Sequence, residues 1–185
     1  LAGIEYCAEV LEDNILLKYK EKQLICTVKG VPEKYGEAFG LGDALSYGYF
    51  KTHGNNLNFV VLGAGVSYNL GINIDNQESV SLWIPNRKSI QILSPEQSFN
   101  RLNLVPSGVI SVDVEFDAQY ILSSHELVRE FTDRDSTIVS ALEFKIKDPE
   151  RIPDIKKEIK NILGDEFDVK DVYDQFDVYR VMKSE

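Results

Sequence analysis

The sequence has few of the residues that build metal centres and nucleophilic sites. Its 185 residues include two histidines, two cysteines, one tryptophan and one methionine. His53 and His125 share no ligand spacing with Cys7 and Cys26, which argues against a zinc site. Both cysteines lie in β-like runs, where a thiol packs as a small apolar group or, in an oxidising compartment, forms a disulfide. The sequence leaves these two alternatives open.

Positive charge and long apolar runs are also scarce. The chain has 20 Lys and Arg residues and 30 Asp and Glu residues, so its net charge is −10. Of the acidic residues, 19 lie in residues 111–185. Such a chain would displace few counterions from phosphates, which argues against nucleic-acid binding. No apolar run reaches the length of about 18 residues that a membrane span needs, and no signal peptide opens the chain. Because the chain begins at Leu1 and its only methionine is Met182, we expect a piece of a longer protein.

The apolar pattern predicts a chain of mixed α and β structure. Residues 14–19 and 23–29 flank a polar turn and predict a β-hairpin. Strands are expected at 3–10, 14–19, 23–29, 57–62, 79–84, 101–116, 120–122, 137–146 and 167–170. Helices are expected at 32–39, 65–70, 125–131, 152–163 and 171–185, with a connector at 40–57 and a long hairpin or protruding loop at 85–97.

The clearest predicted helix is 152–163. Its apolar residues fall on a single stripe, and Gly164 follows as a stop signal. The stripe consists of Ile152, Ile155, Ile159, Ile162 and Leu163.

The stretch FVVLGAGVSYNLG at 59–71 resembles the strand, Gly-x-Gly turn and helix of a dinucleotide-binding fold. That fingerprint needs a third glycine where Tyr68 stands, since a ring there would hold helix and strand apart. It also needs an acidic residue near position 83, which is Trp83. We therefore interpret Gly63 and Gly65 as a strand-to-helix turn, and we expect no cofactor in this domain.

Other candidate sites have simpler structural interpretations. The chain has an aspartate at every third position from 168 to 177: Asp168, Asp171, Asp174 and Asp177. This spacing fits a cation site or, as we favour, the solvated face of a helix. Trp83 and Tyr35 are possible ligand platforms, but isolated aromatic residues in strands and short helices usually pack in a core. No nucleophile-elbow motif is present, and the sequence offers no recognisable catalytic residue. A Ser/His/Asp triad assembled only in space stays open at this point.

Four segments, in chain order, resemble the extracytoplasmic domains of ABC-transporter permeases of the FtsX-like/MacB-like class. They are VKGV at 28–31 with the helix that follows, VVLGAGVSYNLGI at 60–72 leading to SVSLWIP at 79–85, SGVISVDVEFDAQYIL at 107–122, and YRVMKSE at 179–185. The last is similar to the segment before the second transmembrane helix in the lipoprotein-releasing LolC/LolE permeases.

The resemblance implies an α+β fold of two lobes. Residues 1–50 and 119–170 would form a Porter-like α/β lobe, and 51–118 an inserted, β-rich Sabre-like lobe. Residues 171–185 would form a stalk helix of roughly 20 Å that leads to the second transmembrane helix. The domain would then lie on the periplasmic side of the bacterial inner membrane, as part of an integral membrane protein.

The resemblance also implies a mechanical function without catalysis. Cytoplasmic ATPase subunits would drive motion that the permease, with a second permease subunit, transmits to this domain during lipoprotein release. A MacB-like export domain for drugs or peptides is an alternative within the same superfamily. A secreted ligand-binding protein or hydrolase is an alternative of another class.

In LolC-like relatives a hairpin hook captures the periplasmic lipoprotein carrier, and by position that hook corresponds to residues 85–100. The contact candidates are Arg87, Lys88, Ile90, Ile92 and Leu93. An exposed apolar tip flanked by bases suits a partner interface, although an ordinary surface loop is an equal alternative.

Overall fold

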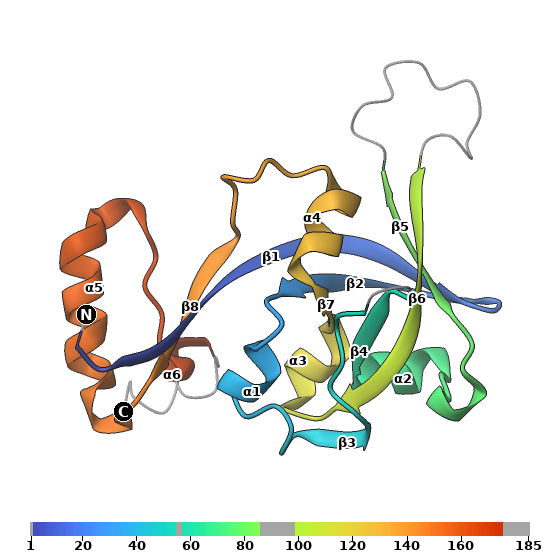
Figure 1. The fold of residues 1–185 in the computed structure, drawn as a ribbon, viewed down its shortest axis with the longest axis horizontal. Helices are drawn as coiled ribbons and strands as arrows, with labels where there is room; N and C mark the ends of the chain where they lie inside the picture. Colours follow the sequence, from blue (N-terminus) through green and yellow to red (C-terminus); the bar gives the residue numbers. More distant parts are fainter. Residues whose placement is uncertain (1, 55–56, 86–98, 176–185) are drawn as a thin grey trace, which may run out of the picture. The chain divides into compact units, whose positions relative to one another are not determined.

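The computed structural model describes residues 2–54, 57–85 and 99–175 (Figure 1). The strands are β1 (Ile4–Tyr19), β2 (Lys22–Val31), β3 (Leu45–Gly48), β4 (Phe59–Gly63), β5 (Val80–Pro85), β6 (Phe99–Ile110), β7 (Tyr120–Ser124) and β8 (Ala141–Ile146). The α-helices are α1 (Tyr35–Ala38), α2 (Ala64–Leu70), α3 (Val114–Gln119), α4 (His125–Thr132), α5 (Ile152–Leu163) and α6 (Val172–Gln175). The predicted α+β class is confirmed.

The chain divides into two compact units. The larger unit is Ala8–Glu143, and the smaller unit combines Leu1–Cys7 with Phe144–Glu185. The lobes expected at 1–50 with 119–170 and at 51–118 stay a prediction.

Six strands of the larger unit close into a ring. β1 pairs antiparallel with β2, β2 parallel with β7, and β7 antiparallel with β4. β4 pairs parallel with β6, β6 antiparallel with β5, and β5 antiparallel with β1, which completes the ring. β3 adds to β6, and β8 adds to β1. Closure pairs both edges of each ring strand over part of its length, which satisfies backbone hydrogen bonds that an open sheet would expose.

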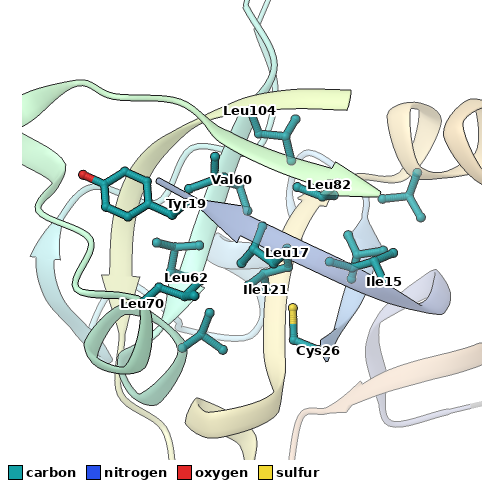
Figure 2. Close-up of a cluster of buried hydrophobic side chains, with 14 of the residues drawn as sticks. Ile15, Leu17, Tyr19, Cys26, Val60, Leu62, Leu70, Leu82, Leu104 and Ile121 are labelled. Atoms are coloured by element: carbon teal, nitrogen blue, oxygen red, sulfur yellow. The ribbon is translucent and has the colours of Figure 1, made fainter. Parts of the chain in front are cut away.

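The predicted β1–β2 hairpin is confirmed, and its alternation separates an inner from an outer face. Ile15, Leu17 and Tyr19 are buried, whereas Leu16 and Lys18 between them are only half-buried. Burying an aliphatic side chain of this size contributes roughly 1.5–3 kcal/mol. The other ring strands and α2 supply further core side chains: Cys26, Val60, Leu62, Leu70, Leu82, Leu104 and Ile121 (Figure 2).

The Gly-x-Gly segment forms the predicted strand-to-helix turn. β4 ends at Gly63, α2 begins at Ala64, and Gly71 closes α2 with a φ of +68°. A Cβ atom at Gly63 would lie 2.4 Å from the carbonyl oxygen of Asp117, because the backbone of α3 passes directly beside the turn. Tyr68 is 86% exposed, so its ring does not lie between the helix and the strand. The expectation that a ring at this position would hold them apart is wrong.

The predicted strand over 101–116 is wrong in its last part. β6 ends at Ile110, and Val114–Gln119 form α3. The Asp113 carboxylate accepts hydrogen bonds from the backbone N–H groups of Glu115 and Phe116, both at 2.9 Å. This N-cap stabilises a helix where the alternating pattern alone predicts a strand.

Other boundaries also differ from the prediction. The strands expected at 3–10 and 14–19 form the single strand β1. The expected connector at 40–57 contains β3, and no strand forms at 167–170. β8 begins at Ala141 rather than at Thr137, because the Asp135 carboxylate holds the Thr137 N–H at 2.9 Å and its hydroxyl at 2.7 Å in a turn.

The smaller unit contains the predicted helix at 152–163, which is confirmed as α5. Ile155 and Ile159 are buried, whereas Ile162 is 67% exposed, so the apolar stripe is only partly covered. α6 covers four residues of the helix expected at 171–185, and positions 176–185 lie outside the described residues. Within the described ranges, every helix is too short or too polar to cross a bilayer.

Candidate partner-binding site

The five predicted contact residues, Arg87, Lys88, Ile90, Ile92 and Leu93, lie outside the described residues. The structure does describe the two strands that flank them. β5 and β6 pair antiparallel from Val80 opposite Leu104 to Pro85 opposite Phe99, and they lie side by side in Figure 1. The strand predicted at 79–84 is therefore confirmed as β5, and the first part of the strand predicted at 101–116 as β6. The hairpin or loop predicted at 85–97 and its contact residues stay a prediction.

The outer face of these strands carries a row of residues that the sequence did not reveal. Strand register places Ile25 opposite Leu16, Leu16 opposite Trp83, and Trp83 opposite Arg101. The row thus crosses β2, β1, β5 and β6. Ile25 is 74% exposed, and Leu16 and Trp83 are half-buried. Alternation within β1 and β5 predicts the outward residues, but only the pairing of β1 with β5 shows that they are neighbours.

Two cations flank the indole ring of Trp83. The Lys18 Nζ lies 4.1 Å from the ring centroid, and the Arg101 Cζ lies 5.3 Å from it. The Arg101 Nε donates a hydrogen bond to the Ser81 hydroxyl at 3.0 Å, which fixes the guanidinium beside the ring. No carboxylate of the described residues forms an ion pair with either cation. We call Leu16, Lys18, Ile25, Trp83, Phe99 and Arg101 the Trp83 face.

Trp83 and Phe99 give this face an aromatic end next to the undescribed part of the hairpin. Their ring centroids are 6.1 Å apart at 62°, an edge-to-face contact that favours a defined geometry. The Trp83 Nε1 is buried and has no acceptor among the described residues. An unmet donor of this kind costs about 1–3 kcal/mol. Trp83 therefore departs from the core packing predicted for it, whereas Tyr35 is buried as predicted.

The two histidines are brought close to one another, but not as a metal site. The His53 Nδ1 lies 2.8 Å from the Thr52 hydroxyl, and its Nε2 lies 3.3 Å from the Glu126 carboxylate. His125 lies 3.1 Å from Arg129, and burial followed by the charge of Arg129 lowers its pKa. Among the described residues, no group of three His, Cys, Asp or Glu side chains is placed to hold a metal ion.

The structure shows ion pairs in the aspartate series and no disulfide between the two cysteines. Lys156 contacts Asp171 at 3.1 Å and also the Asp174 carboxylate, and these contacts, with a backbone hydrogen bond, lower the pKa of Asp174 to about 2. Asp168 is exposed, whereas Asp171 and Asp174 pair with Lys156 and do not form the purely solvated helix face that was predicted. Asp177 lies outside the described residues. No disulfide joins Cys7 to Cys26, and burial raises the pKa of the Cys26 thiol to about 12.

Two solved structures have a similar overall fold. The extracellular domain of the noncanonical ABC-type transporter YknZ from Gram-positive bacteria matches with a TM-score of 0.58 and 13% identity, over 91% of this chain and 79% of that one. The chain has the fold of such extracytoplasmic domains. The periplasmic region of MacB from Actinobacillus actinomycetemcomitans matches with a TM-score of 0.56 and 17% identity, over 88% of this chain and 67% of that one. No protein-family model and no curated protein sequence matches the chain.

Proposed function

We propose that this chain is the extracytoplasmic domain of an ABC-transporter permease on the outer side of a bacterial inner membrane. Its partners would be cytoplasmic ATPase subunits, acting through the rest of the permease, and a second permease subunit. The observation that carries the proposal is the fold shared with the YknZ extracellular domain over 91% of the chain. The permease-like segments of the sequence, such as 60–72 and 179–185, support it independently.

The proposed role is mechanical and requires no catalytic residue or cofactor. ATP hydrolysis in the cytoplasm would move the membrane helices, and this domain would turn that movement into handling of a substrate. A closed ring of strands suits such a role, because a densely packed interior transmits displacement with little deformation.

We further propose that the substrate is a lipoprotein released from the inner membrane, and that a periplasmic lipoprotein carrier binds at the β5–β6 hairpin. Arg87, Lys88, Ile90, Ile92 and Leu93 would contact the carrier. The Trp83 face would extend that surface, since it combines exposed apolar area with two cations that have no described carboxylate partner. Aromatic residues and arginine are enriched where protein partners bind.

Export of drugs or peptides in the manner of a MacB-like domain is the second candidate. The similar fold of the MacB periplasmic region is the observation in its favour. The two candidates differ in what the hairpin meets, because a carrier for lipoproteins is a soluble protein, whereas export requires a partner in the outer membrane.

Site-specific photo-crosslinking in cells tests this proposal. A photoreactive residue would replace Arg87, Ile90 or Leu93 in the full-length protein, with the exposed Tyr68 on α2 as the matched control position. We expect the hairpin positions to trap a periplasmic lipoprotein carrier and the Tyr68 position not to trap it. Capture of an outer-membrane protein would support the export function instead, and equal capture from Tyr68 would remove the hairpin from the proposal.

A further inference from the structure

The strand β8 lies at the edge of the sheet and contributes no residue to the buried core. In the part of the chain that the structure describes, its strand partner is β1 alone. Ala141 and Leu142 are exposed, and the other four residues of β8 are half-buried. Each strand of the ring, by contrast, carries buried side chains. Apolar burial therefore holds β8 in place much less than it holds the ring strands.

A buried cation of the ring, Lys29 on β2, contacts β8 through an ion pair. Its ammonium contacts the Glu143 carboxylate on β8 and lies 3.3 Å from the Glu12 carboxylate on β1. Strand register places Lys29 directly opposite Glu12, so one side chain connects three strands. Because Lys29 is buried, loss of a carboxylate partner would leave its charge poorly compensated, which is costly. The ion pair with Glu143 therefore favours the position of β8 against the ring.

Directional hydrogen bonds hold the same segment. The buried Tyr35 on α1 donates its hydroxyl hydrogen bond to the Glu143 carboxylate at 2.5 Å. Ser140, directly before β8, donates its backbone N–H to the Val10 carbonyl oxygen at 2.8 Å. The Ser140 hydroxyl also accepts a hydrogen bond from the Glu12 N–H at 2.8 Å. Since such bonds form only at short distances, these contacts exist only while β8 lies beside β1.

We propose that Lys29, Tyr35 and Glu143 lock a releasable edge strand: β8 opens from β1 as a local unit while the ring of strands stays closed. The pairs that β1 forms with β2 and β5 do not involve β8, so the ring keeps its hydrogen bonds when β8 leaves. The chain passes between the two compact units twice, within β1 after Cys7 and within β8 after Glu143. Release of β8 thus leaves β1 as the strand that joins the units. The inference does not rest on the transport function.

Native-state hydrogen exchange of the isotope-labelled chain, followed by NMR, tests the lock. The amides of Ser140 and Lys147 report on the two ends of β8, because each donates to a backbone carbonyl oxygen of the N-terminal segment. Leu17 and Val28 report on the ring, since each is paired with a strand on both sides. In the unaltered chain we expect the two β8 amides to exchange at least about tenfold faster than the two ring amides.

Glu143→Gln keeps the shape of the side chain and removes the charge that pairs with Lys29. It should accelerate exchange of the Ser140 and Lys147 amides about tenfold more, and the ring amides less than about twofold. Tyr35→Phe removes only the hydroxyl that donates to Glu143, so it should give the same pattern with a smaller, about threefold, acceleration. Circular dichroism verifies that each variant is folded.

Glu78→Gln is the matched control. Like Glu143, Glu78 contacts one lysine ammonium and accepts a hydrogen bond from one tyrosine hydroxyl, but its partners Lys20 and Tyr19 lie at the β1–β2 turn. This substitution should leave exchange at both ends of β8 unchanged. If the β8 amides of the unaltered chain exchanged as slowly as the ring amides, β8 would open only with the whole fold, and the proposal would be wrong. Equal acceleration of β8 and the ring by Glu143→Gln, or no acceleration of β8, would equally overturn it.

Discussion

The inner and outer faces of the strand ring are made by neighbouring residues and serve different purposes. In β5 the buried Leu82 is followed directly by Trp83, and in β1 the buried Leu17 is followed by Lys18. The inward residues form a continuous apolar core (Figure 2). The outward residues of these strands form the Trp83 face. One alternating pattern therefore determines stability on one side and leaves the other side available for binding.

The side chains on the two faces also differ in the kinds of partner that they contact. Inside the ring, apolar side chains are surrounded by other apolar side chains, so each one stabilises the fold. On the Trp83 face, Lys18 and Arg101 lie over an aromatic ring rather than beside a carboxylate of the described residues, and the Trp83 Nε1 has no described acceptor. Groups in this condition stabilise the fold less than the buried core side chains do.

Leu17→Ala should have the largest effect on stability. The side chain is fully buried in the middle of β1, so its removal leaves a cavity and should lower the free energy of unfolding by about 2–5 kcal/mol. Ile25→Ala on the outer face removes a side chain of the same size and should cost about 1 kcal/mol or less. Urea unfolding monitored by circular dichroism measures both. Equal losses would contradict the division into two faces.

Gly63→Ala should have the next largest effect. Its new methyl group would meet the Asp117 carbonyl oxygen, which is backbone and cannot rotate away, so we expect a loss of about 1–3 kcal/mol. Gly42→Ala is the matched control, because nothing lies within 4 Å of the position that its Cβ would occupy. The same unfolding experiment compares the two variants, and a tolerated Gly63→Ala would show that α3 does not constrain the turn.

The Gly63 region also shows what the sequence determines and what it does not. The strand, the turn and the helix were predictable, because the apolar run and the two glycines are local signals. The reason for the glycine was not predictable, because Asp117 lies 54 residues further along the chain, and its approach depends on the pairing of β4 with β7. Local chemistry thus predicted elements, whereas tertiary contacts explain individual residues.

The same distinction applies to the candidate site. The strands predicted at 79–84 and at the start of 101–116 followed from local patterns and are confirmed as β5 and β6. The Trp83 face requires β5 to pair with β1, and these strands are far apart in sequence, so alternation alone did not reveal it. The error at 112–116 has the opposite cause: the capping carboxylate of Asp113 is a local signal, but the alternating pattern was given more weight.

Charge substitutions on the Trp83 face should alter fluorescence quenching more than stability. Trp83 is the only tryptophan, so its emission reports on this face alone. Lys18 and Arg101 should attract iodide to the indole, and the double substitution Lys18→Gln with Arg101→Gln should lower the iodide quenching constant about twofold. Quenching by neutral acrylamide is the control and should change little, and stability should fall by about 1 kcal/mol or less. An unchanged iodide constant would mean that the two cations do not set the local potential.

The smallest expected effect concerns His125 at the start of α4, whose side chain is half-buried. Burial and then the charge of Arg129 lower its pKa, and the carboxylates of Glu126 and Glu9 only partly oppose this change. The unfolded chain therefore binds a proton more readily than the folded chain, so stability should be present above pH 6.5, near the ordinary histidine pKa, and fall as the pH drops toward the lower folded value.

An NMR titration of the His125 ring protons measures this pKa directly. Arg129→Gln removes the neighbouring charge and should raise the pKa toward 6.5 without reaching it, because burial persists. Lys18→Gln removes a charge on the Trp83 face and should leave the His125 pKa unchanged. A pKa at or above 6.5 in the unaltered chain would show that burial does not govern this histidine.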